Sequence, residues 1–299
     1  MVALDPRINP FRPEIAAKYL QGQVEAARFV EGARHEVVEP IAGLWRTASH
    51  EARLDTQALL GECVIVYETT DEGWAWGQIE TDGYVGWLSA NALGKTGRAP
   101  THKVATPRTL GFPGPDIKLP PAVALPMGAR LAIVRQDERF AVTANGWHLP
   151  AVHLAPIKAR LPDFVAVAEE FLHAPYLWGG KTSLGIDCSG LVQVALQAAG
   201  HACPRDSDMQ EMALGKLSSL GELRRGDLVF WKGHVAIARD GGIKFPFFIS
   251  GRQLKCLPFN PHFTAPHRMT ADDAGIGNDF AGAGQTKIIP QMFFRRNGL

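Results

Sequence analysis

The sequence is poor in cysteine, in long hydrophobic runs and in net charge, and each shortage excludes a class of protein. Its four cysteines, at positions 63, 188, 203 and 256, lack the paired CxxC spacing of a zinc site and are too sparse for a disulfide framework. No stretch of about 18 apolar residues could span a membrane, and the first residues form no basic-then-apolar secretion signal. A net charge of +1 gives no reason to expect binding to nucleic acid or to a membrane surface. We therefore expect a cytoplasmic protein that requires no metal and no cofactor.

The first half of the chain contains short apolar runs separated by turn signals. Residues 1–35 include apolar residues at helical spacing and predict an N-terminal helical segment that packs on another domain. Residues 36–97 alternate β-rich runs with Asp-Gly-type turns and predict a small β-barrel. Residues 98–158 repeat part of this pattern and predict a second barrel. We expect the core of the first barrel to contain at least two of its tryptophans Trp74, Trp76 and Trp87.

Cys188 stands between a glycine-rich loop and an apolar stretch of helical character. Asp187 is a good N-cap residue, and Gly200 is a natural end for the helix. A cysteine in the first turn lies at the positive end of the helix dipole, which favours the nucleophilic thiolate and predicts a lowered pKa. The alternative is that Cys188 is a small buried hydrophobic residue, as most free cysteines are.

His234 opens one of two short strands that follow. The runs at 228–231 and 235–238 are apolar and joined by a Lys-Gly turn, so they predict a β-hairpin. At the start of the second strand His234 could face the first turn of the helix that contains Cys188. A structural histidine is the alternative interpretation, since a cysteine followed by a histidine is by itself a weak signal.

Five segments together resemble the papain-like NlpC/P60 peptidase family. They occur in the order Tyr176-Leu-Trp-Gly-Gly, Asp187-Cys-Ser-Gly, Pro204-Arg-Asp-Ser-Asp-Met-Gln, Arg225-Gly-Asp-Leu-Val-Phe and Gly233-His-Val-Ala-Ile. The resemblance covers about residues 164–240. It implies an α+β papain-like catalytic domain over 159–299, preceded by two small SH3-like β-barrels. It also implies hydrolysis of the bond between D-glutamate and a diamino acid in peptides derived from peptidoglycan.

The resemblance assigns roles to single residues. Cys188 would attack the scissile carbonyl, and His234 would act as the base. Tyr176 would donate its hydroxyl to the oxyanion or to the substrate, although it could instead pack under the loop. Substrate contacts would come from Asp187, Ser189, Trp178, Asp206 and Ser207. For Asp187 we weigh helix capping equally against binding of a peptide amine.

For three of these residues a structural role competes. Asp206 and Ser207 could form the loop and N-cap of a short helix, and Trp178 could pack in the core.

The resemblance weakens from about Gly242 onward. The family places a third polar residue, usually histidine, where this chain has Pro246, which offers no side-chain acceptor. The tail is either divergent or the product of a reading-frame change. Asn260, His262, His267 or Gln253 could orient His234 instead. A catalytically impaired or inactive protein that binds murein peptides is therefore the alternative to an active cysteine peptidase.

Overall fold

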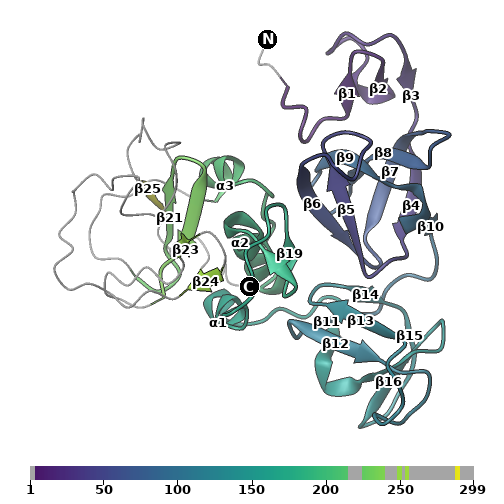
Figure 1. The fold of residues 1–299 in the computed structure, drawn as a ribbon, viewed down its shortest axis with the longest axis vertical. Helices are drawn as coiled ribbons and strands as arrows, with labels where there is room; N and C mark the ends of the chain where they lie inside the picture. The colour runs from purple at the N-terminus through teal and green to yellow at the C-terminus, as the bar shows by residue number, and fades with distance from the viewer. Residues whose placement is uncertain (1–3, 215–223, 240–247, 251–252, 256–286, 290–299) are drawn as a thin grey trace, which may run out of the picture. The chain divides into compact units, whose positions relative to one another are not determined.

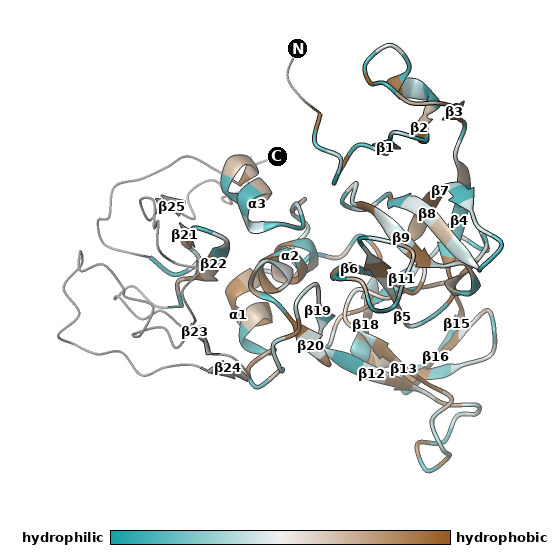
Figure 2. Ribbon diagram, turned by 45° about the horizontal axis from the view of Figure 1, so that its top comes forward, coloured by the Kyte–Doolittle hydropathy of each residue, from teal (hydrophilic) through white to brown (hydrophobic). Residues whose placement is uncertain are grey.

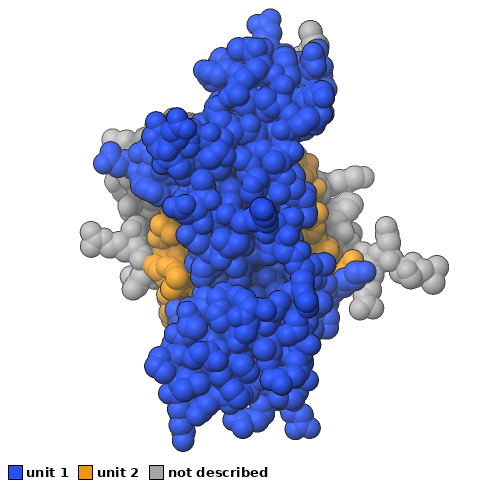
Figure 3. All heavy atoms as spheres, turned by 90° about the vertical axis from the view of Figure 1, so that its right-hand side faces the viewer, with its two compact units in different colours: residues 1–159 blue, residues 160–299 orange. Residues whose placement is uncertain are grey.

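A computed structural model describes residues 4–214, 224–239, 248–250, 253–255 and 287–289 of the chain (Figure 1). The chain divides into two compact units, residues 1–159 and 160–299, which Figure 3 colours separately. Among the described residues, every helix is too short or too polar to cross a membrane.

The segment before residue 33 forms short strands in place of the expected helix. It contains β1 (Phe11–Arg12), β2 (Ile15–Ala17), the 3-10 turn η1 (Lys18–Leu20) and β3 (Phe29–Val30). The helix prediction is wrong. Three consecutive residues, those of β2, are all buried, whereas an amphipathic helix buries only the residues on one of its faces. β2 pairs with β1 and β3, and Ile15 packs with Trp76 and Val85. The segment thus packs on residues of the same compact unit.

Residues 33–95, called here the first β module, form one seven-stranded sheet in the order β10-β4-β7-β8-β9-β5-β6. Aliphatic side chains fill its core, among them Val37, Leu44, Val64, Ile79 and Leu88, and Figure 2 shows hydrophobic residues along β7 and β9. The elements are β4 (Ala33–Val37), β5 (Ile41–Trp45), β6 (Leu54–Leu59), β7 (Cys63–Thr69), β8 (Trp74–Ile79), β9 (Val85–Ser89), η2 (Ala90–Ala92) and β10 (Leu93–Lys95).

The tryptophans of this module lie outside its aliphatic core, contrary to expectation. Successive residues of a strand point to opposite faces, so when Ala75 and Ile79 of β8 join the core, Trp76 faces away from it. Trp76 and Trp87 pack instead under the N-terminal segment, where the Arg12 guanidinium lies 4.6 Å from the centroid of each ring. Trp74 contacts other aromatic rings, at 5.5 Å from Trp45 and 4.6 Å from His50.

Residues 102–156 form a second β module around a separate core of Val104, Leu125, Ala129, Leu131 and Leu149. Its elements are β11 (His102–Val104), β12 (Arg108–Gly111), β13 (Val123–Pro126), β14 (Arg130–Leu131), β15 (Ile133–Gln136), β16 (Phe140–Thr143), β17 (His148–Pro150), η3 (Ala151–His153) and β18 (Leu154–Pro156).

The two modules share one pattern of strand pairing. In the first, β4 pairs with β10 and β7, β5 pairs with β6, and β8 lies between β7 and β9. In the second, β11 pairs with β18 and β14, β12 pairs with β13, and β16 lies between β15 and β17. Each module also places a 3-10 turn, η2 or η3, directly before its last strand. The repeat that the sequence predicts is therefore visible in the order of the elements.

The second unit is of the α+β type. Its helices are α1 (Phe164–Glu169), α2 (Cys188–Ala198) and α3 (Ser207–Ala213). Strand β21 (Leu228–Trp231) lies between β22 (His234–Ile237) and β25 (Lys287–Ile289), antiparallel to both. Among the described residues, this unit also contains two antiparallel strand pairs. β19 (Lys181–Thr182) pairs with β20 (Gly185–Ile186), and β23 (Phe248–Ser250) pairs with β24 (Gln253–Lys255). The predicted helix after Asp187 and the predicted hairpin are both confirmed.

Ion pairs connect helix α1 to the hairpin. Arg225, which precedes β21, donates to the carboxylate of Asp163 at 2.8 and 3.1 Å and to Glu169 at 3.2 Å. Arg239, which follows β22, donates to the same Glu169 at 2.7 Å. These contacts fix the hairpin against α1, while α2 packs directly on β22.

Candidate active site

Cys188 is the first residue of helix α2, and close packing fixes that first turn. Asp187 adopts an extended N-cap conformation, and its Oδ1 accepts the Gly190 backbone N–H at 2.7 Å. A Cβ on Gly190 would lie 2.3 Å from the carbonyl oxygen of Gly180. The helix start can therefore approach the 179–180 loop only because residue 190 is glycine.

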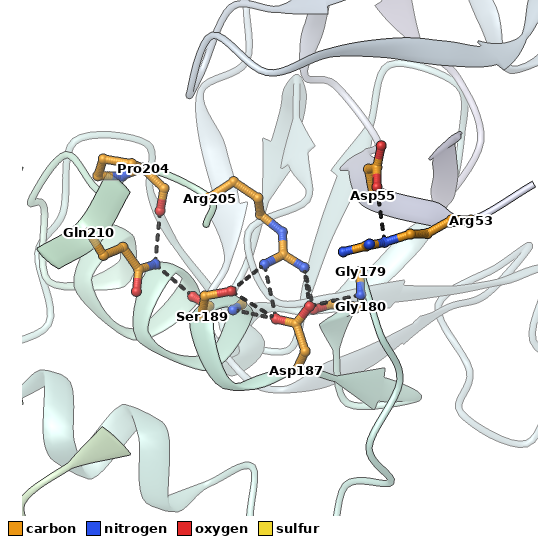
Figure 4. Close-up of polar contacts among 10 residues, drawn as sticks. Arg53, Asp55, Gly179, Gly180, Asp187, Ser189, Pro204, Arg205 and Gln210 are labelled. Carbon is orange, nitrogen blue, oxygen red and sulfur yellow. Dashed lines mark hydrogen bonds and ion pairs between the residues drawn. The ribbon is translucent and has the colours of Figure 1, made fainter. Parts of the chain in front are cut away.

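The Asp187 carboxylate accepts five hydrogen bonds from the protein (Figure 4). Oδ1 accepts from Gly190 N, from Ser189 Oγ at 3.3 Å and from Arg205 Nη1 at 2.9 Å. Oδ2 accepts from Gly179 N and from Arg205 Nη2, both at 2.8 Å. A carboxylate has about four acceptor positions, so these donors occupy it fully. Helix capping by Asp187 is confirmed, and binding of a substrate amine by the same carboxylate stays a prediction.

Arg205 is the residue at this site that sequence reasoning missed. It is 1% exposed, and besides Asp187 it donates to Ser189 Oγ at 2.9 Å and to the Gly180 carbonyl at 3.3 Å. Gln210 extends the network, because its Nε2 donates to the carbonyls of Ser189 and Pro204, each at 2.9 Å. Both residues belong to the Pro204–Gln210 segment, one of the five segments on which the family resemblance rests. That motif is the sequence signal that could have identified them.

Cys188 and His234 are brought together by the packing of α2 on β22. His234 opens β22, and the backbone N–H of the next residue, Val235, donates toward the Cys188 sulfur. The carboxylate of Asp187 acts electrostatically on both side chains. The structure therefore places Cys188 next to the first residues of β22, the strand that begins at His234.

The expected lowering of the Cys188 pKa is wrong. Burial, and then the negative charge of Asp187, raise the pKa of the Cys188 thiol to about 12, against smaller opposing effects of Val235 N–H, Arg205 and Ser189 N–H. Burial also lowers the pKa of His234 to about 4, although Asp187 opposes this shift. Removing the ionised groups from water outweighs the dipole of an 11-residue helix. Both shifts favour the neutral form of the side chain, so the imidazole of His234 can accept a proton.

The other predicted residues lie around the start of α2 or of α3. Tyr176 forms a β-bridge with Ile186, directly before Asp187. Trp178 is 49% exposed, so the alternative of core packing does not hold for it. Asp206 occupies the N-cap position of α3 and Ser207 is its first residue, but the Asp206 side chain makes no capping hydrogen bond.

The candidates for a third catalytic residue fall largely beyond what the structure describes. Gln253 is the first residue of β24. Pro246, Asn260, His262 and His267 lie outside the described residues.

Comparison with known proteins gives two family matches. The profile of the NlpC/P60 family matches residues 173–269, and that of the bacterial dipeptidyl-peptidase Sh3 domain matches residues 44–93. The gamma-D-glutamyl-L-lysine dipeptidyl-peptidase of Bacillus subtilis is 31% identical over 232 residues, which make up 68% of this chain and 75% of that protein. The chain belongs to the NlpC/P60 family. A protein of the same description from Bacillus cereus is 26% identical over 73% of each chain.

A solved NlpC/P60 family structure from Bacillus cereus agrees in fold. Its TM-score is 0.64 at 21% identity, covering 76% of this chain and 95% of that one. Residues 44–93 are accordingly an SH3 domain within the first β module. The NlpC/P60 match continues to residue 269, past Gly242, where the sequence pattern weakens.

Proposed function

We propose that this chain is a cysteine peptidase that hydrolyses the γ-D-glutamyl–diamino acid bond of peptides derived from peptidoglycan. The observation that carries the proposal is the placement of Cys188 at the start of α2, next to Val235 of strand β22, which begins at His234. Its relatives support the substrate class, since two of them are gamma-D-glutamyl-L-lysine dipeptidyl-peptidases.

The protonation states of the two residues indicate how the reaction starts. His234 takes the thiol proton as Cys188 attacks the scissile carbonyl, and later returns it to the leaving amine. Because burial raises the pKa of Cys188 and lowers that of His234, both side chains favour their neutral forms before the attack. The backbone N–H of Cys188 at the helix start, with the Tyr176 hydroxyl, would stabilise the oxyanion.

Substrate recognition is proposed for the residues around the same helix start. Ser189, Trp178, Asp206 and Ser207 would contact the peptide. The amino terminus of the peptide would face Asp187 and would share acceptor positions with the five protein donors of that carboxylate. The half-exposed indole of Trp178 supports this, because an apolar ring held at the surface offers a contact area.

We further propose that the second β module is an SH3-like barrel. The strand pairings that it shares with the first module, and the 3-10 turn before the last strand, support this assignment.

A cytoplasmic site of action on free peptides is also proposed. The low cysteine content fits a reducing compartment. Intact cross-linked peptidoglycan should consequently be a poor substrate compared with short soluble peptides.

The function is tested with L-Ala-γ-D-Glu-L-Lys and its diaminopimelate counterpart. Mass spectrometry should show cleavage between the second and third residues. The N-acetylated peptides should be cut poorly, and a peptide with an α-linked L-glutamate should not be cut. Equal turnover of the α-linked peptide would contradict the proposed specificity.

The variant His234→Ala separates an enzyme from a binding protein. It should abolish hydrolysis while leaving peptide binding, measured by calorimetry, within a few-fold of the wild type. Tight binding without turnover by the wild-type chain would instead favour the non-catalytic alternative.

A further inference from the structure

Arg205 connects three separate parts of the second unit. Its guanidinium donates to both oxygens of Asp187, to Ser189 Oγ at the start of α2 and to the Gly180 carbonyl in the preceding loop. Arg205 itself lies two residues before α3 and is almost completely buried (Figure 4). A planar, forked donor set is needed to reach these acceptors together.

The same contacts place a positive charge beside the nucleophile. The Asp187 carboxylate directly precedes Cys188, and its negative charge opposes formation of the thiolate. Arg205 has the opposite effect on the pKa of Cys188. The other ionisable residues on the elements packed against α2 are His234 on β22, Lys181 on β19, Glu169 on α1, and Asp208 and Glu211 on α3, with Asp206 directly before α3.

We propose that Arg205 is a positioning residue, which holds Asp187 in its capping geometry and neutralises the carboxylate charge next to the Cys188 thiol. Asp187 caps the start of the helix. The positive charge of Arg205 reduces the effect of the Asp187 carboxylate on thiolate formation at Cys188. The inference rests on the proposed role of Cys188 as the nucleophile.

Two properties of Arg205 can be separated by substitution. Arg205→Lys keeps the positive charge but loses the fork. Arg205→Met removes both and leaves Asp187 as a buried, uncompensated carboxylate. The double variant Asp187→Asn with Arg205→Met removes both charges, so the electrostatic penalty on the thiol should disappear. A purely structural role would make the double variant no better than Arg205→Met.

The experiment measures alkylation of Cys188 by iodoacetamide between pH 7 and 10.5, with peptide mapping after short pulses. Arg205→Met should label about tenfold more slowly at each pH, the change in thiolate that one pKa unit produces. Arg205→Lys and the double variant should both stay within about threefold of the wild type. Cys63 and Cys203, which are buried, serve as internal reporters of an intact fold in every sample.

The control is Arg46→Met, which removes an arginine paired with Asp55 in the first β module. It should leave the pH profile of Cys188 labelling unchanged. An unchanged profile in Arg205→Met, or a double variant that labels as slowly as Arg205→Met, would overturn the proposal. If Arg205→Met does not fold, a tenfold loss of labelling in Arg205→Lys or in the double variant would overturn it.

Labelling requires no substrate, so the result is independent of peptide turnover. If Cys188 labelling follows the expected pattern in every variant but the tripeptide is not cleaved, only the proposed function is contradicted.

Discussion

Substitution of Gly190 by alanine should reduce turnover far more than it reduces stability. The new Cβ would lie 2.3 Å from Gly180 O and 2.9 Å from Asp187 Oδ1. An ordinary contact between carbon and oxygen is longer than 3 Å, so the loop or the helix start must move by about 1 Å. Both neighbours belong to the structure that positions Cys188, and neither is the far end of a flexible side chain.

The cost in stability is limited by a compensating effect. Overpacking costs about 1–3 kcal/mol, whereas replacing glycine by alanine in a helix contributes up to about 1 kcal/mol. We therefore expect the free energy of unfolding to fall by about 0–2 kcal/mol. A shift of about 1 Å at the reacting atoms can reduce the rate by about a hundredfold.

Urea unfolding and the tripeptide hydrolysis assay on the same preparations test this expectation. Gly97→Ala is the control, because its Cβ would meet only the Glu36 carboxylate at 3.5 Å, an ordinary contact. It should change neither quantity. A Gly190→Ala variant with near wild-type kcat/KM would refute the idea that close packing at Gly180 fixes the position of the nucleophile.

Two further predictions concern acid stability and the N-terminal segment. Because burial lowers the pKa of His234 from 6.5 to about 4, the unfolded state takes up a proton that the folded state does not. The free energy of unfolding should thus decrease as the pH falls from 6.5 to about 4, and His234→Gln should flatten this part of a urea-denaturation profile; equal slopes in both proteins would contradict the shift. Arg12→Ala should destabilise the protein by about 1–2 kcal/mol, since Arg12 contacts two tryptophan rings and pairs with Glu68. Arg28→Ala, which removes a more exposed partner of Glu68, should cost less, and equal losses would rule out the ring contacts as the cause.

Local patterns predicted the parts of the fold that local interactions determine. The cap at Asp187, the helix that starts at Cys188 and the hairpin at 228–237 all depend on neighbouring residues, and all three are confirmed. The N-terminal segment was wrongly predicted, because the burial of Ile15 under Trp76 is a contact between residues 61 positions apart. Tertiary packing there outweighs the weak helical preference of the segment.

In the candidate site, too, local motifs were predictable from the sequence and contacts between distant segments were not. The positions of Cys188 and His234 followed from motifs, but the pairing of Asp187 with Arg205 joins two segments that no periodicity connects. The sign of the Cys188 pKa shift depended on burial, which a spacing pattern does not report. Helix-dipole reasoning from sequence therefore gave the wrong direction for the pKa shift of Cys188.

The pairing of first and last strands in each β module has a consequence for how such chains are rearranged. β4 pairs with β10 in the first module and β11 pairs with β18 in the second, so the chain enters and leaves each module at the same edge. A module whose ends are adjacent can be copied, inserted or excised at the gene level with only a short join in the remaining chain. Either module could therefore be exchanged without extending the backbone on its two sides.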